Sequence, residues 1–131
     1  MDKPISYMMT KTVQTANTED TVEHIEELLN LHGLSSVPVV DSKGMLFGII
    51  SASDLLHFHS TGKSPKEAHA WEICTYKPIE VGPNTPVGEV ARLMVKNKIH
   101  HVVVSENKSI QGFVSSLDFV EQYVLKGAPN P

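Results

Sequence analysis

Apolar residues recur along this chain with two different spacings, and the order of these spacings occurs twice. The segments around Val22 and Val87 have apolar residues at every third or fourth position, as in a helix with one buried stripe. Each segment is followed by two apolar runs rich in β-branched residues, which predict buried strands. The four predicted strands cover residues 34–40, 46–50, 99–104 and 110–114.

Turn residues between these strands predict two hairpins, with turns at residues 41–44 and 106–109. Short β-like segments are expected at residues 12–15 and 78–81, ahead of the two helices. Asp20 and Thr85 are the expected N-caps of these helices, and Pro86 is expected at the first helical position. Residues 64–67 are expected to begin a further short helix.

The pattern Gly-x-x-Ser-x-x-Asp marks the duplication most clearly. It runs from Gly48 to Asp54 and again from Gly112 to Asp118, each time from the end of a strand into a helix. We therefore expect two β-α-β-β-α repeats, residues 1–62 and 63–131, in an α+β (α/β) fold. One repeat alone buries little apolar area, so the two are expected to pack sheet to sheet, with pseudo-two-fold symmetry and helices outside.

Charge and composition exclude several classes of protein. The net charge of −4 removes the general attraction to a phosphate backbone, so nucleic acid is not an expected partner. The single cysteine permits no internal disulfide. No apolar run approaches the roughly 18 residues of a membrane span, and the first residues lack the apolar core of an export signal. These features predict a cytoplasmic protein with no membrane partner.

Catalytic and metal chemistry find little support in the spacing of reactive residues. The histidines and the cysteine between residues 57 and 74 match no closed Cys/His metal signature. Ser53, Asp54 and His57 are close in sequence, but no Gly-x-Ser-x-Gly elbow accompanies them. The sequence therefore predicts neither an enzyme nor a metal site.

The order and duplication of these features resemble the cystathionine-β-synthase (CBS) domain pair, also called a Bateman module. The likeness runs from Ile5 to Leu125. It rests on the related lead-in segments 5–10 and 70–75, the amphipathic helices, the run 34–41 and the two Gly-x-x-Ser-x-x-Asp elements. The chain resembles a stand-alone pair.

The resemblance implies a regulatory module that binds AMP, ADP, ATP, NAD or S-adenosylmethionine in clefts between the repeats and signals to a partner protein. The residues implied for one site are Ser51, Ser53, Asp54, Thr75, Pro78, Ile79, Ile99, His100 and His101. The residues implied for the other site are Thr10, Thr12, Val13, Leu34, Ser35, Ser36, Ser115 and Asp118.

The chemistry of the two aspartates agrees with this implication. An ionised carboxylate accepts a hydrogen bond from each of two neighbouring ribose hydroxyls, which suits Asp54 and Asp118. The same Ser-x-x-Asp spacing also fits a capping box at a helix start. The two roles are compatible, because a capping carboxylate has a second oxygen to present to a ligand.

The histidine pair His100-His101 is the main difference between the repeats, since the matching positions are Ser35-Ser36. Along a strand one histidine is expected to point inward and the other outward. A protonated histidine binds phosphate, so the site assigned this pair is expected to favour a phosphorylated ligand. The other site lacks positive charge and suits a nucleoside-like or S-adenosyl ligand. The only arginine, Arg92, lies on a predicted helix, which disfavours tight ATP binding.

The expected function is therefore a non-catalytic adenosine-ligand sensor. The alternative is a ligand-free dimerisation and interaction scaffold. The resemblance also implies a homodimer that associates through outer helices. The regions expected at that interface are Leu28/Leu29, Leu55/Leu56, Met94 and Phe119/Val120/Tyr123.

Overall fold

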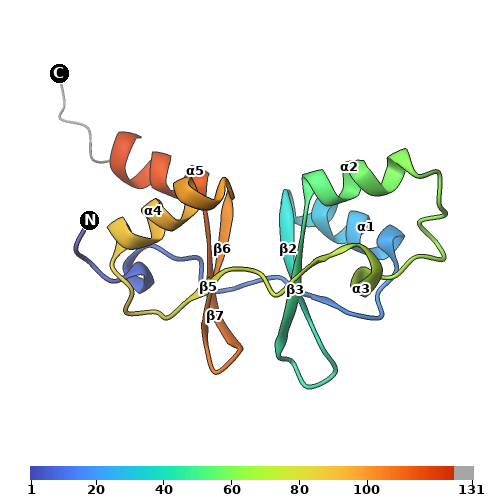
Figure 1. Cartoon of the computed structure of the whole chain (residues 1–131), viewed down its shortest axis with the longest axis horizontal. Coiled ribbons are helices and arrows are strands. Elements are labelled where there is room, and N and C mark those ends of the chain that lie inside the picture. Colours follow the sequence, from blue (N-terminus) through green and yellow to red (C-terminus); the bar gives the residue numbers. More distant parts are fainter. Residues whose placement is uncertain (126–131) are drawn as a thin grey trace. The chain divides into compact units, whose positions relative to one another are not determined.

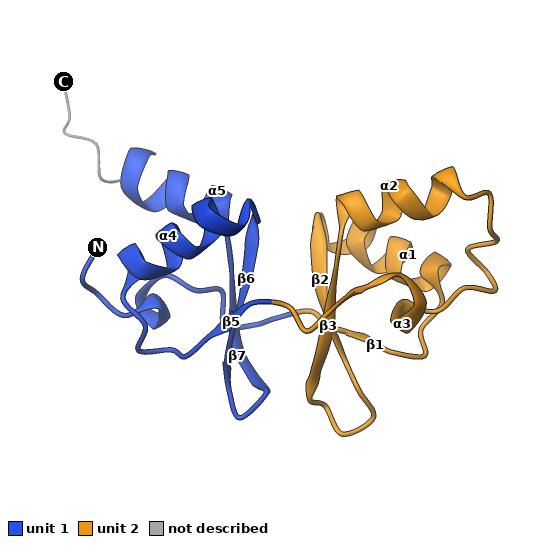
Figure 2. Cartoon of the chain, viewed as in Figure 1, with its two compact units in different colours: residues 1–13, 79–131 blue, residues 14–78 orange. Residues whose placement is uncertain are grey.

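The chain forms two compact units, each with its own sheet, helices and core (Figure 2). The computed structural model describes residues 1–125, so the last six residues of the repeat predicted at 63–131 lie outside it. Unit 1 combines residues 1–13 with those from 79 onward, and unit 2 comprises residues 14–78. The compact units therefore have other bounds than the repeats of the sequence. The first 13 residues pack with the second repeat, and residues 63–78 pack with the first.

Unit 2 contains a sheet with strand order β1-β2-β3-β4. Strand β1 is parallel to β2, and the other neighbours are antiparallel. The helices α1, α2 and α3 lie beside this sheet (Figure 1). In chain order the elements are β1 (Ala16–Asn17), α1 (Val22–His32), β2 (Ser36–Val40), β3 (Leu46–Ser51), α2 (Ala52–Ser60), α3 (Ala70–Ile73) and β4 (Thr75–Tyr76).

Unit 1 repeats this plan with a sheet of order β5-β6-β7, in which β5 is parallel to β6 and β7 is antiparallel to it. An isolated bridge from Thr10 to Phe113 occupies the place that β4 has in unit 2. The elements are η1 (Ile5–Tyr7), β5 (Glu80–Val81), α4 (Val87–Asn97), β6 (His101–Glu106), β7 (Ser109–Ser115), α5 (Ser116–Phe119) and the π-helical η2 (Val120–Leu125).

The α+β class and both hairpins are confirmed. The turn between β6 and β7 has Asn107 and Lys108 at φ 51° and 64°, the left-handed pair that a two-residue hairpin loop requires. Two predicted segments differ from the structure. The first β-like segment lies at Ala16–Asn17 and not at 12–15, because the pairing with β2 begins only at Ala16. Residues 64–67 form a turn and not the start of a helix.

Each unit encloses a separate apolar core. In unit 1, Ile5 is fully buried among the residues of α4, β6 and β7. In unit 2, Ile25 and Leu29 of α1 pack against β2 and β3. Complete burial of one such side chain contributes about 1.5–3 kcal/mol to folding. Two residues expected at a dimer interface, Leu29 and Met94, are only 7% and 5% exposed and belong to these cores. Within a unit they are therefore core residues and not outer-face residues.

The starts of the two long helices also differ from the prediction. Thr21, and not Asp20, caps α1, and its Oγ1 accepts a hydrogen bond from the His24 N–H at 3.1 Å. Asp20 instead accepts a bond from the Asn17 N–H, which closes the preceding turn. Helix α4 begins at Val87, so Pro86 occupies the cap position that was predicted for Thr85.

Candidate functional site

Asp54 lies at the start of α2 within a cluster of hydroxyl groups from unit 2. Its Oδ2 accepts hydrogen bonds from the Ser51 N–H at 2.8 Å and from the Ser51 hydroxyl at 3.1 Å. The hydroxyls of Ser51 and Ser53 are 2.9 Å apart. The Thr75 hydroxyl reaches Asp54 Oδ1 at 3.4 Å from β4. The structure thus brings together four residues that were assigned to one site.

The geometry of this cluster depends on the close approach of β4 to Gly48. A Cβ atom at Gly48 would lie 2.7 Å from both Cys74 Sγ and the Thr75 carbonyl oxygen. Glycine is therefore required for Thr75 to reach Asp54. Burial, and after it the Asp54 carboxylate, raises the pKa of the Cys74 thiol above its usual value. Cys74 is therefore a protonated packing group at neutral pH.

Asp118 holds the same position at the start of α5 in unit 1. Its Oδ2 accepts a hydrogen bond from the Ser115 N–H at 2.7 Å, and its own N–H donates to Ser115 Oγ at 3.3 Å. The predicted capping boxes are thus present in both copies of the motif. The carboxylate in each unit is fixed in orientation by its own helix start.

His101 lies beside the Asp118 element, because it pairs with Ser115 across β6 and β7. Its ring stacks on Phe113, with ring centres 5.4 Å apart and planes inclined by 12°. Burial, followed by the neighbouring His100, lowers the pKa of His101, and the Asp118 carboxylate acts in the opposite direction. The expected alternation is also present, since His101 is half-buried and His100 is exposed.

Phe113 contacts a residue of the candidate site, and the sequence interpretation missed it. It contacts His101 through the ring stack and exchanges backbone hydrogen bonds of 2.9 and 3.0 Å with Thr10. The matching residue of unit 2 is Ile49, which pairs with Thr75. The sequence could have pointed to Phe113, because it is an aromatic residue within the second Gly-x-x-Ser-x-x-Asp element and lies in the same repeat as the histidine pair.

The residues predicted for the two sites are divided between the units as follows. Unit 2 holds Leu34, Ser35, Ser36, Ser51, Ser53, Asp54, Thr75 and Pro78, and unit 1 holds Thr10, Thr12, Val13, Ile79, Ile99, His100, His101, Ser115 and Asp118. The resemblance grouped the histidine pair with Asp54. The structure places His101 in unit 1 with Ser115 and Asp118. The groupings that join residues of different units stay predictions.

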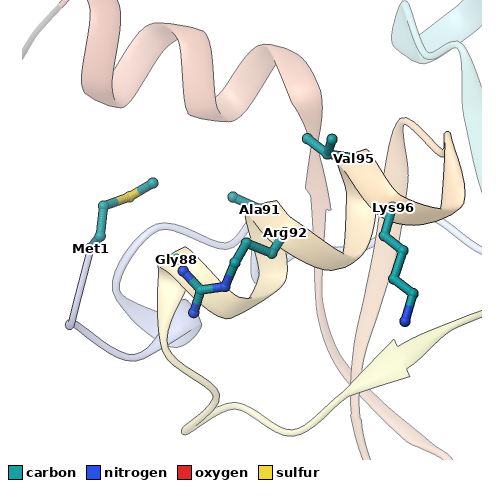
Figure 3. Close-up of a pocket in the computed structure, with 6 residues that line it drawn as sticks. All are labelled: Met1, Gly88, Ala91, Arg92, Val95 and Lys96. Carbon is teal, nitrogen blue, oxygen red and sulfur yellow. The ribbon is translucent and has the colours of Figure 1, made fainter.

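A hollow of about 370 Å³ lies along α4 (Figure 3), and none of the predicted site residues lines it. Its lining is mostly apolar, and Val95 in it is 79% exposed. In Figure 3 the side chains of Arg92 and Lys96 point away from Val95. Within residues 1–125, no helix is both long and apolar enough to cross a membrane. Over the same residues, no three His, Cys, Asp or Glu side chains gather where a metal ion could bind.

Comparison with known proteins identifies relatives of both repeats. The family model of the CBS domain matches residues 5–60 and 70–124. An uncharacterized protein of Methanocaldococcus jannaschii is 30% identical over 131 residues, which cover 98% of this chain and 47% of that protein. The inosine-5′-monophosphate dehydrogenase of Korarchaeum cryptofilum is 33% identical over 109 residues, which cover 82% of this chain and 22% of that enzyme. The chain thus spans about half or less of the length of these relatives.

Solved structures agree over most or all of the chain. The CBS domain pair of protein MJ0100, in complex with 5′-methylthioadenosine and S-adenosyl-L-methionine, has a TM-score of 0.84 and 26% identity, covering 92% of this chain and 98% of that one. A putative acetoin utilization protein from Vibrio cholerae has a TM-score of 0.85 and 25% identity over all of both chains. Because the family model matches both repeats, and the two matches together take in most of the chain, this protein belongs to the CBS domain family.

Proposed function

We propose that this protein is a non-catalytic regulatory module that binds an adenosine ligand and signals its presence to a partner protein. The candidate ligands are AMP, ADP, ATP, NAD and S-adenosylmethionine. Membership of the CBS family supports this proposal, as does the MJ0100 pair, which was solved with two adenosine compounds. Asp54 and Asp118 are the proposed ribose ligands.

The observation that carries the proposal is the fixed orientation of a carboxylate in each unit. Asp54 Oδ2 is held by two hydrogen bonds of 2.8 and 3.1 Å, while Oδ1 receives one long bond of 3.4 Å from Thr75. A carboxylate has about four lone-pair directions, so Asp54 retains acceptor capacity for ribose hydroxyls. A side chain that is already oriented loses less entropy when a ligand binds.

Calorimetric titration with the five ligands tests the proposal. At least one ligand should bind the wild-type chain, and the double variant Asp54→Asn, Asp118→Asn should lose that binding. Each substitution keeps the shape of the side chain and removes the charge that strengthens a bond to a hydroxyl. Circular dichroism should show the same helix content in both proteins.

A control separates ligand binding from capping. Glu72 accepts a hydrogen bond from the His69 N–H at 3.3 Å and so caps α3, but it is not a predicted ligand residue. Glu72→Gln should lower the melting temperature slightly and leave ligand affinity unchanged. The proposal fails if none of the five ligands binds the wild-type chain, or if the double variant binds as tightly as the wild type.

The proposed module is a homodimer, and exposed apolar residues on the helices of unit 1 support this part of the proposal. Val95 of α4 is 79% exposed, and Val124 of η2 is 58% exposed. Val95→Glu should reduce the mass measured by light scattering to that of a monomer. If ligand binding fails while the dimer persists, the ligand-free scaffold is the better description.

A further inference from the structure

The side-chain oxygen of Ser36 in unit 2 is buried without a hydrogen-bond partner among the described residues. The residue is only 3% exposed. Leaving a buried hydroxyl unpaired lowers the stability of the folded state. Folded proteins seldom retain such a cost without a reason, and a ligand that supplies the missing partner is one such reason.

The position of Ser36 directs this hydroxyl to the Asp54 cluster. Ser36 is the register partner of Ser51 across β2 and β3, and paired residues of antiparallel strands project from the same face of the sheet. Ser51 in turn bonds to Ser53 and Asp54. The cluster therefore offers hydroxyls and one carboxylate on a single face of unit 2.

Positive charge is scarce around this cluster. The nearest lysine in sequence to Thr75 is Lys77, whose Nζ lies 5.5 Å from the centre of the Tyr76 ring. A phosphate beside Asp54 would meet a carboxylate and neutral hydroxyls, and like charges at this range repel each other. The cluster suits a ligand part that is neutral or cationic.

The matching position in unit 1 has the opposite chemistry. His101 pairs with Ser115 as Ser36 pairs with Ser51, and it has His100 and Asp118 as its charged or titratable neighbours. Protonation of an imidazole adds a positive charge beside Asp118, and a phosphate dianion favours that protonation. The side chain at this one position therefore changes the charge that a ligand meets.

We infer that Ser36 and His101 set the ligand class of their units: the Asp54 cluster takes an adenosine compound without phosphate, and the Asp118 cluster takes a nucleoside monophosphate. This inference rests on the function proposed above and assigns the histidine pair to Asp118. The Ser36 hydroxyl then finds its partner in the ligand. A uniform pair of sites would have the same residue at both positions.

Adenosine and AMP, which differ only in the phosphate, test this inference by calorimetric titration of the full chain. His101→Ser should weaken AMP binding by about tenfold or more, since a hydrogen bond to a charged group contributes about 1.5–3 kcal/mol. Its adenosine affinity should change by less than twofold. Ser36→Ala should do the reverse, weakening adenosine severalfold and leaving AMP within twofold.

Stability measurements keep the Ser36 test independent of folding. Ser36→Ala removes an unpaired buried hydroxyl, so the ligand-free variant should unfold at the same or a higher urea concentration than the wild type. Ser105 is the matched control, because it is also buried but donates to Glu80 at 2.8 Å. Ser105→Ala should lower stability and leave both affinities unchanged.

The outcomes separate this inference from the proposed function. If the wild type binds neither adenosine nor AMP but binds another of the five candidate ligands, the proposed function stands and this inference fails. If it binds none of them, both fail. If the wild type binds but each variant changes both affinities by the same factor, the function stands and the division between Ser36 and His101 is wrong. An unchanged adenosine affinity in Ser36→Ala would equally overturn the role of the unpaired hydroxyl.

Discussion

Gly48 and Gly112 hold the same place in the two motifs but face different neighbours. A Cβ at Gly48 would meet the backbone oxygen of Thr75 as well as the Cys74 sulfur, whereas the three atoms nearest to a Cβ at Gly112 all belong to the side chain of Met9. A backbone atom in a paired strand cannot move away, while a methionine side chain has three rotatable bonds with which to adapt. The two glycines are therefore unequal in their tolerance of a methyl group.

We predict that Gly48→Ala lowers the free energy of unfolding by about 1–3 kcal/mol, the usual cost of overpacking. Gly112→Ala should cost less. Urea denaturation of both variants measures the difference, and Gly82→Ala, which adds a methyl group in open space, is the control. Equal losses at Gly48 and Gly112 would contradict the assignment of the Thr75 carbonyl as the obstacle.

His101 should make the folded chain sensitive to acid. Burial is the main cause that lowers the pKa of His101 in the folded state below the ordinary histidine value of about 6.5. Below that pH the unfolded chain therefore takes up a proton that the folded chain resists. The free energy of unfolding should therefore fall as the pH drops below 6.5, and more steeply than in His101→Gln. Parallel pH profiles of the two proteins, measured by thermal denaturation, would exclude this contribution.

The sequence predicted the two aspartates and their capping boxes because spacing alone defines that motif. It grouped the residues of each site only through the family resemblance, and the groupings that join the two units stay predictions. Ser36 lies opposite Ser51, and His101 opposite Ser115, because of strand register. The hairpins were predicted without their registers, so these pairs became visible only in the structure.

At the scale of elements, strand and helix positions followed from apolar periodicity, but the helix starts did not. The first amides of α1 donate to the carbonyls of Ala68 and Pro65, at 2.9 Å each. The first amides of α4 donate to the carbonyls of Lys3 and Met1, at 2.8 and 2.9 Å. Backbone carbonyls from distant segments thus serve as caps, and a carbonyl leaves no signature in the sequence.

Helix α4 ends at a strained residue, which gives a prediction for this element. Lys98 has φ 54°, in the left-handed region, whereas α1 ends with Gly33 at φ 63°. Because a side chain in this conformation costs about 1–2 kcal/mol, Lys98→Gly should raise the melting temperature. Lys96→Gly, inside the same helix, should lower the melting temperature, because glycine within a helix costs about 1 kcal/mol of stability. A lower melting temperature in Lys98→Gly would contradict the claim that the conformation of Lys98 is strained.

At the scale of the whole molecule, the chain crosses between units near residues 13 and 78. Ile5 is fully buried with Val102 and Val114, although it lies 97 residues before the first of them and 109 before the second. The lead-in segment of one repeat therefore stabilises the other repeat. No local sequence pattern reports such an exchange.

Amide hydrogen exchange tests this connectivity. Ile5→Ala should destabilise unit 1 by about 2–5 kcal/mol, the usual range for a buried isoleucine. Protection should fall in β6 and β7 and remain in β2 and β3. Ile25→Ala should give the reverse pattern. Loss of protection in β2 and β3 of the Ile5 variant, with β6 and β7 unaffected, would contradict the division into these units.

The crossing of the chain between the units also determines which unit is synthesised completely first. Unit 2 is continuous, so every residue of its core has been made once synthesis reaches residue 78. The first 13 residues are made earliest, yet Ile5 has no core to join until β6 and β7 are translated. Residues 1–13 of the nascent chain must therefore wait without their core partners while unit 2 folds, since domains form as their residues emerge.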